Sequence, residues 1–257
     1  ISDIIKQANF IASKNVKEIV LTGVNIGDFG VKNNESFYEL IKELEKIDNI
    51  KRFRISSIEP NLLSEKIIKF VARSKKFLPH FHIPLQSGSP SILNKMRRRY
   101  KLSLFNQRLR MIKKNIPDAS IGIDVIVGFP GETENKFNET LSFLKEANFS
   151  YLHVFSYSER VNTDAKEYDN KINNAIIIER SKQLRNLSLM KTDSFYKENL
   201  GSTRKVLIES HDSGTLFGLT ENYVKVKTKG IKSEINTIMD LKISAVDGKQ
   251  MRGDRLV

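Results

Sequence analysis

Short runs of β-branched and aromatic residues alternate with longer amphipathic segments over the first 160 residues. The longer segments place apolar residues three or four positions apart, as in Phe37, Leu40, Ile41 and Leu44, which predicts helices. The short runs predict strands at 18–24, 52–57, 80–85, 121–127 and 151–157. Strands that alternate with helices indicate an α/β fold with a parallel sheet. Five strands are too few for a closed eight-stranded barrel. A partial barrel or an open doubly wound sheet is therefore expected.

The pattern changes after a long polar segment at 170–199, which predicts one helix, and Gly201 ends it. Short alternating runs follow, separated by turn residues such as Asp247-Gly248. They predict strands at 203–209, 215–219, 222–228, 238–246 and 255–257. Five short strands in this space favour a small antiparallel β-barrel. Two domains are predicted, 1–199 and 200–257.

Composition narrows the class of protein. Hydrophobic residues make up 39% and charged residues 28%, and no apolar run approaches the roughly 18 residues of a membrane span, so neither disorder nor a spanning helix is expected. The net charge of +13 is typical of a protein with a polyanionic partner, most often nucleic acid, although lysines on solvated faces give the same value. The absence of cysteine excludes disulfides and thiolate metal sites within these residues.

Polar and glycine residues gather where the five predicted strands end. Because ligands bind at the carboxyl ends of parallel strands, these segments predict one composite pocket. The segments are 22–28, 56–60, 86–89, 128–132 and 157–160. Asp124 stands inside an apolar strand, where a carboxylate is costly unless paired, so it either accepts a hydrogen bond from a ligand or lies on a solvated face. His82 is open to the same two readings, and a structural histidine is the commoner case.

Several enzyme templates are absent: GxGxxG, the Walker A loop, GxSxG and HExxH. The four histidines are scattered and supply no recognisable set of metal ligands, so no metal site is predicted. Residue patterns alone therefore predict a basic α/β domain with a strand-end pocket and a small barrel, without a reaction.

Longer motifs resemble one known family. Residues 82–100 (HIPLQSGSPSILNKMRRRY), 121–137 (IGIDVIVGFPGETENKF) and 151–160 (YLHVFSYSER) are similar to radical S-adenosylmethionine (SAM) methylthiotransferases, and 21–30 and 54–60 fit the same family. The triplet Arg97–Arg99 followed by Tyr100 looks most like the branch that acts on threonylcarbamoyladenosine beside the tRNA anticodon. Residues from about 200 onward, including 218–223, resemble the RNA-binding TRAM β-barrel.

The resemblance implies a partial (β/α) radical SAM barrel followed by a TRAM-like barrel. In this family a 4Fe–4S cluster binds SAM and cleaves it to a 5′-deoxyadenosyl radical, and a second cluster helps to deliver the methylthio group. The cluster cysteines are expected upstream of residue 1, so no catalytic residue is assigned within this chain. The intact protein is expected to bind SAM and two 4Fe–4S clusters, and this chain alone is expected to bind neither cluster and to be inactive.

The resemblance also implies site residues. The backbone from Gly23 to Asn25 would bind the methionyl amino group, Asp124 and Gly128 would line the adenosine side, and Arg160 would pair with the carboxylate. The methionyl or ribose part would contact Glu59, Gln86 and Ser87. RNA contacts are expected from Arg97, Arg98, Arg99, Tyr100, Asn222 and Tyr223. The arginine cluster also fits a solvated helix end whose cations complement the helix dipole.

The expected partners are the tRNA anticodon stem-loop and an electron donor such as flavodoxin, in the cytoplasm and without a membrane. Two alternatives remain open at this stage. One is methylthiolation of isopentenyladenosine in tRNA or of a ribosomal-protein aspartate. The other is a non-catalytic RNA-binding protein.

Overall fold

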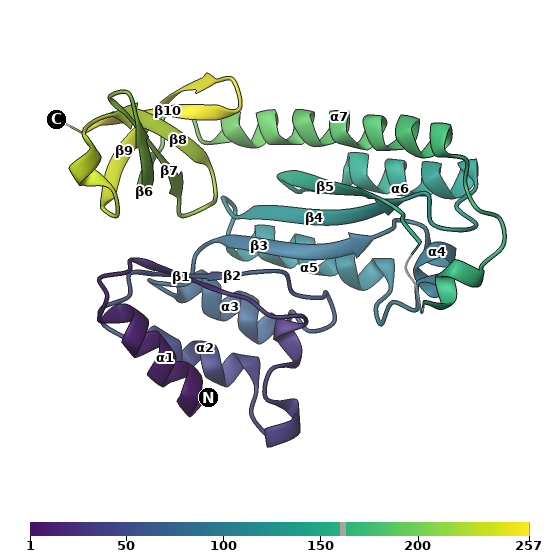
Figure 1. The fold of residues 1–257 in the computed structure, drawn as a ribbon, viewed down its shortest axis with the longest axis horizontal. Helices are drawn as coiled ribbons and strands as arrows, with labels where there is room; N and C mark the ends of the chain where they lie inside the picture. Colours follow the sequence, from purple (N-terminus) through teal and green to yellow (C-terminus); the bar gives the residue numbers. More distant parts are fainter. Residues whose placement is uncertain (160–162, 257) are drawn as a thin grey trace.

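A computed structural model describes residues 1–159 and 163–256 of the chain. Five strands in the first part run parallel in the order of the sequence (Figure 1). They are β1 (Glu18–Leu21), β2 (Arg52–Ile55), β3 (His80–Gln86), β4 (Ser120–Val127) and β5 (Tyr151–Ser156). The β1–β2 pair meets the β3–β4–β5 sheet through single bridges such as Ser57 to His82. The predicted α/β class and all five predicted strands are confirmed.

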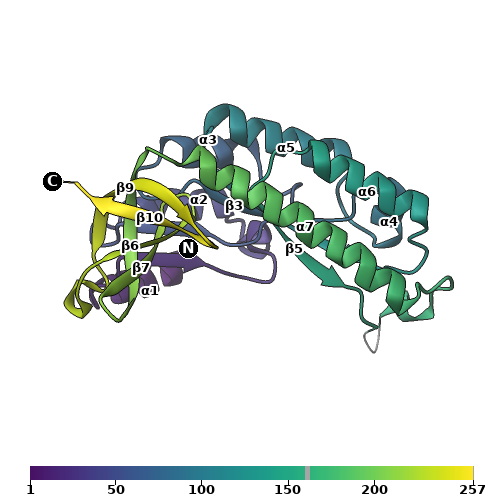
Figure 2. The same cartoon turned by 90° about the horizontal axis from the view of Figure 1, so that it is seen from above.

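Helices connect the strands and pack on one face of the sheet. They are α1 (Ser2–Ala12), α2 (Phe37–Glu45), α3 (Glu65–Arg73), α4 (Pro90–Lys95), α5 (Leu102–Asn115), α6 (Glu134–Glu146) and α7 (Asn174–Glu198), with 3₁₀ turns at Ile26–Asp28, Val31–Asn33, Asp164–Glu167 and Lys232–Glu234. Seen from above, α3, α5 and α6 form a row along one side, and α7 runs beside β5 (Figure 2). Their apolar side chains form a single core with alternate strand residues such as Phe53, Ile83 and Ile123.

The opposite face of the sheet carries the intervening strand residues, among them Arg54, His82, Asp124 and His153. We call it the polar face. Successive side chains of a strand point to opposite faces of the sheet. Most apolar residues of each strand therefore lie on the helix-covered face, and the polar residues between them lie on the polar face. Helices on one face only are the arrangement of a partial barrel and not of a doubly wound sheet.

The C-terminal strands close into a separate barrel in the order β10-β8-β7-β6-β9. They are β6 (Thr203–Asp212), β7 (Thr215–Thr220), β8 (Lys225–Lys229), β9 (Ile238–Asp247) and β10 (Gln250–Arg255). All neighbours are antiparallel except β8 and β10, which are parallel. The prediction of a last strand at 255–257 was wrong, because the tight turn at Gly248 pairs Gln250 directly with Asp247 and starts the strand earlier.

This barrel sits against the amino ends of the parallel strands, and the last turn of α7 adds Phe195 and Tyr196 to its apolar core. The carboxyl ends of the strands lie on the other side and remain uncovered by the barrel (Figure 1). Within the described ranges, none of the helices has the length and apolar character to cross a bilayer.

Candidate functional site

The carboxyl ends of β1 and β2 are linked through arginines. Arg99, in the loop after α4, lies 3.2 Å from the Asp28 carboxylate and 3.3 Å from that of Glu59. Arg98 lies 3.6 Å from Glu59. The Asn25 side chain donates a hydrogen bond to Asp28. The structure therefore places Glu59, predicted to contact SAM, against two arginines predicted to contact RNA.

A cleft of about 710 Å³ opens on the polar face at the carboxyl ends of β3, β4 and β5. Gln86, Ile126, Phe155 and Ser156 line its base, and Arg98 lies at its rim. Apolar side chains such as Phe155 and charged side chains such as Arg98 both contribute to the lining, and the volume lies within the roughly 300–1,000 Å³ of small-molecule sites. The cleft contains residues of three of the five strand-end segments predicted to form one pocket, and its described lining includes none from 22–28 or 56–60.

Gly128 shapes the turn beside this cleft. Its φ of +84° is a conformation that favours glycine, and its N–H donates to the Glu132 carboxylate at 3.0 Å. Glu132 is buried and pairs with Arg180 at 2.9 Å. Burial raises the pKa of Glu132, and the hydrogen bonds from Gly128 and Arg180 oppose that shift. The carboxylate therefore fixes the turn from inside the protein.

Ser87 has a structural role. Its hydroxyl is buried, lies 3.2 Å from the Thr140 hydroxyl and accepts the Ser89 N–H at 3.1 Å. These contacts point the side chain toward α6 and away from the cleft. The side chain of Ser87 thus holds the turn after β3, and the expected contact of Ser87 with the methionyl or ribose part of SAM stays a prediction.

The arginine triplet is exposed in part, whereas the tyrosine after it is not. Arg97 is 74% exposed and pairs with Asp164 at 2.6 Å. Tyr100 is only 5% exposed, and its hydroxyl donates to the carbonyls of Pro84 and Leu85 at 2.8 and 3.0 Å. Burial raises the pKa of Tyr100 above its ordinary value. A buried ring cannot stack on a base, so the predicted RNA contact of Tyr100 was wrong.

Asn222 and Tyr223 attach the small barrel to the sheet. Asn222 is fully buried and donates to the Asp118 carbonyl at 3.0 Å and to Asn199 at 2.9 Å. The Tyr223 ring stacks on His80 at a centroid distance of 4.1 Å. Both residues lie at the amino ends of the strands, far from the cleft. The predicted RNA contact of Asn222 was therefore wrong, because its side chain is fully buried in the junction, whereas the RNA contact of the partly buried Tyr223 stays a prediction.

Arg52 and Arg54 complete that junction and were not singled out in the sequence. Arg54 lies 2.8 Å from Glu18 on β1, and Arg52 donates to the Leu219 carbonyl of the barrel at 3.2 Å. Both arginines are buried, and burial lowers the pKa of Arg52. Their two-residue spacing in a short strand indicates a shared polar face, which is the signal that could have identified them.

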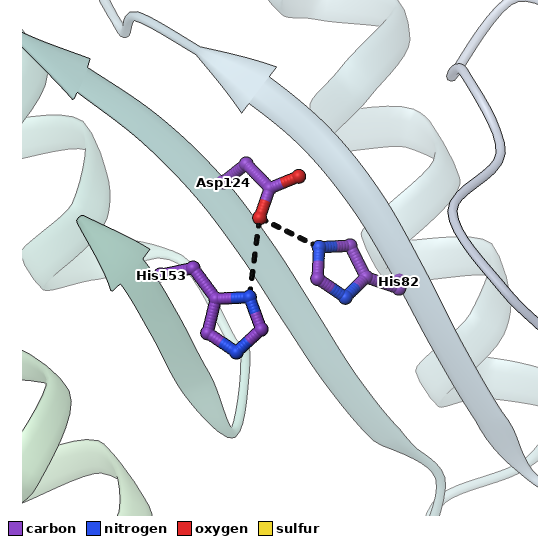
Figure 3. A group of neighbouring side chains, drawn as sticks. All are labelled: His82, Asp124 and His153. Carbon is purple, nitrogen blue, oxygen red and sulfur yellow. Dashed lines mark hydrogen bonds and ion pairs between the residues drawn. The ribbon is translucent and has the colours of Figure 1, made fainter. Parts of the chain in front are cut away.

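Three polar side chains from neighbouring strands meet in the middle of the polar face (Figure 3). Oδ1 of Asp124 lies 2.7 Å from Nε2 of His82 and 3.4 Å from Nδ1 of His153. Asp124 and His153 are register partners in the β4–β5 pair. Burial and the nearby His82 lower the pKa of His153. Asp124 is therefore paired, as a carboxylate in an apolar strand requires.

We call these three residues the His-Asp-His cluster. The cluster lies next to the cleft, on the side of the amino ends of the strands. Ile126 and Phe155, which line the cleft, follow Asp124 and His153 by two residues and point to the same face. His153 was not recognised in the sequence as a site residue, although it also lies on the polar face. Arg160, the expected partner of the SAM carboxylate, falls outside the described residues.

Comparisons with known proteins place this geometry in a family. Residues 1–144 match the radical SAM superfamily. The chain is 38% identical over 248 residues to threonylcarbamoyladenosine tRNA methylthiotransferase MtaB of Bacillus subtilis, covering 94% of the chain and 55% of that protein. It is 33% identical to tRNA-2-methylthio-N(6)-dimethylallyladenosine synthase of Lachnoclostridium phytofermentans, covering 99% of the chain and 57% of that protein. The chain thus spans about half the length of these relatives.

Solved structures share the fold. The archaeal Elp3 of Methanocaldococcus infernus superposes with a TM-score of 0.50 at 10% identity, covering 92% of this chain and 77% of that one. The methyltransferase TsrM of Kitasatospora setae gives a TM-score of 0.50 at 12% identity, covering 60% of this chain and 30% of that one. At such identities the likeness concerns the fold alone. The sequence match over more than half of the chain, together with the parallel partial barrel and its strand-end cleft, shows that this chain belongs to the radical SAM superfamily.

Proposed function

We propose that the chain is the barrel portion of a tRNA methylthiotransferase that modifies C2 of threonylcarbamoyladenosine next to the anticodon. The observation that carries this proposal is the 38% identity to MtaB of Bacillus subtilis across 94% of the chain. A similar identity over 89% of the chain to MtaB of Aquifex aeolicus supports it.

SAM is the proposed ligand of the strand-end cleft, and the residues present fit it. Gly23, after β1, lies outside the lining of this cleft, and a side chain there would meet no atom closer than 3.8 Å, so a ligand that extends beyond the cleft can approach its backbone. Gln86 and Ser156 offer polar groups, and Ile126 and Phe155 offer apolar contact area for an adenine ring. When bound to a reduced cluster, SAM supplies the radical and methyl-transfer chemistry of this superfamily.

Gly23, Asn25 and Gly128 would contribute backbone contacts, and Glu59 and Gln86 would contact the methionyl or ribose part. The contacts of Asp124 favour a place in the His-Asp-His cluster over direct contact with adenosine. The chain contains no cysteine, so the two proposed 4Fe–4S clusters would take their thiolates from outside these residues, and the chain alone would be inactive.

The tRNA anticodon stem-loop is the proposed partner at the cleft rim. Arg97, Arg98 and Arg99 lie there with Lys95, where a loop must approach to insert a base. Phosphate contacts from such cations supply sequence-independent affinity. The small barrel has ten Lys and Arg against seven Asp and Glu in 200–257, so most of the net charge of +13 lies on the larger domain. We propose that this TRAM-like barrel orients the tRNA. The reaction would take place in the cytoplasm, with an electron donor such as flavodoxin.

The second candidate substrate is dimethylallyladenosine, which is favoured by the 33% identity over 99% of the chain to the Lachnoclostridium phytofermentans synthase. The intact protein, reconstituted with iron and sulfide under anaerobic conditions, should be incubated with SAM, a reductant and each of two tRNAs. The proposal expects a methylthio product only from the tRNA that carries threonylcarbamoyladenosine. Product only from the dimethylallyladenosine tRNA would replace it, and product from neither would refute both.

A further inference from the structure

The His-Asp-His cluster has the geometry of a metal site. Nε2 of His82, Oδ1 of Asp124 and a ring nitrogen of His153 all lie within 4.8 Å of one another. Metal–nitrogen and metal–oxygen bonds of about 2.0–2.2 Å place ligand atoms roughly 3–4 Å apart around one ion. The separation of 3.4 Å between Asp124 and His153 lies within this range, and that of 2.7 Å between Asp124 and His82 is a hydrogen-bond distance slightly below it. Small side-chain rotations would therefore seat an ion between the three groups.

The backbone holds the three ligands rigidly. His82, Asp124 and His153 come from three adjacent hydrogen-bonded strands, and each side chain points to the polar face (Figure 3). Sites built on strands are positioned more precisely than sites on loops. The register of the sheet therefore fixes the spacing of the ligands before any ion binds.

The charge of the cluster also suits a cation. Among the residues that the structure describes, the ion-pair partners of Asp124 are the two histidines, and no lysine or arginine pairs with it. Two imidazoles and one carboxylate, with no lysine or arginine of the described residues paired to them, form a donor set that suits a divalent cation.

We propose that His82, Asp124 and His153 bind one divalent transition-metal ion, such as Zn²⁺, Fe²⁺ or Co²⁺. Imidazole ligands favour these metals, whereas Mg²⁺ and Ca²⁺ prefer oxygen ligands. Three protein ligands leave coordination positions for water or for an oxygen of a bound substrate, as in sites that keep an open position. The site lacks thiolates. It does not depend on the proposed tRNA substrate.

Titration of the whole chain with Co²⁺ after treatment with a chelator tests the proposal. The chain has no cysteine and four histidines, so visible d–d absorption can be assigned to imidazole and carboxylate ligands without a thiolate background. We expect saturation at one Co²⁺ per chain, and displacement of the Co²⁺ spectrum by Zn²⁺. Absence of saturable absorption would overturn the proposal.

Three variants locate the site. His153→Ala and Asp124→Asn should each weaken Co²⁺ binding by about tenfold or more, whereas His211→Ala, in the small barrel, should leave it unchanged. His153 is 52% exposed, so its replacement should preserve the fold even if Asp124→Asn does not. Circular dichroism checks the fold of each variant. Unchanged affinity in His153→Ala, or a loss confined to His211→Ala, would show that the cluster binds no ion.

Discussion

His80 is the most perturbed histidine of the chain. It is buried at the start of β3, where its Nε2 lies 2.8 Å from the Tyr151 hydroxyl and its ring stacks on Tyr223. Burial, reinforced by the positive charge of Arg54, lowers the pKa of His80 well below its ordinary value. The imidazole is therefore neutral in the folded chain at neutral pH, and the junction with the small barrel is built around this neutral form.

This residue predicts a pH dependence of stability. Since the pKa of His80 is lower in the folded than in the unfolded chain, the unfolded chain binds the extra proton first. The neutral His80 therefore contributes its full share to the free energy of unfolding above the ordinary pKa of histidine. As the pH falls below that value, the free energy of unfolding decreases by up to about 1.4 kcal/mol per pH unit for this one group. His80→Phe, which keeps the aromatic contact, should flatten this loss in urea unfolding measured between neutral and mildly acidic pH. His211→Ala is the control and should retain the wild-type slope, and an equal slope in His80→Phe would contradict the account.

At the scale of residues, only part of the candidate site could be predicted from the sequence. Asp124 was expected either to accept a hydrogen bond from a ligand or to lie on a solvated face, and its partners in the structure are the side chains of His82 and His153. The same reasoning missed the burial of Tyr100 and Asn222, because polar groups in loops look alike in sequence whether they face water or satisfy a buried carbonyl. Only the packing of the small barrel and of β3 decides between those outcomes.

At the scale of elements, the strands and helices were predictable because β-branched runs and helical spacing are local signals. The final strand was not, since its start depends on which turn residues close the β9–β10 hairpin. The contact of the barrel with the amino ends of β2 to β5 was not predictable either. It rests on side chains from distant segments, such as Arg54 and Tyr223, whose ring and guanidinium lie 4.9 Å apart.

Glu18 should be essential to that contact, because it pairs with Arg54 and lies 3.8 Å from Arg52. Glu18→Gln keeps the shape but removes the carboxylate with which the two buried arginines pair. Breaking a buried pair in this way typically costs about 3–5 kcal/mol of unfolding free energy. Glu43→Gln removes an exposed pair with Lys46 and should cost no more than about 0.5 kcal/mol. Chemical denaturation measures both, and similar small losses would show that the junction does not depend on Glu18.

At the scale of the whole molecule, the two ends of the parallel sheet have separate tasks. The amino ends are closed by the small barrel, whereas the carboxyl ends carry the cleft and its arginines. The arginine triplet lies at this open end of the sheet, where Arg97 and Arg98 line the cleft. We expect a bound tRNA to contact this rim.

Changing Arg97, Arg98 and Arg99 together to Ala should weaken tRNA binding at low salt. Each lost phosphate contact should reduce the log–log salt slope by about 0.7–0.9. The control changes Arg73, Arg110 and Arg185, which are exposed on α3, α5 and α7, and removes the same charge from the helix-covered side. Filter binding across a salt series gives both slopes. Equal effects of the two triple variants would show that net charge, and not the rim, determines binding.

The most direct test of the central claim is mass spectrometry of tRNA nucleosides from cells in which the intact gene has been deleted. The account predicts loss of the 2-methylthio form of threonylcarbamoyladenosine, accumulation of unmodified threonylcarbamoyladenosine, and recovery of both levels when the intact gene is restored. An unchanged level of the methylthio nucleoside, or loss of the methylthio form of dimethylallyladenosine instead, would contradict it.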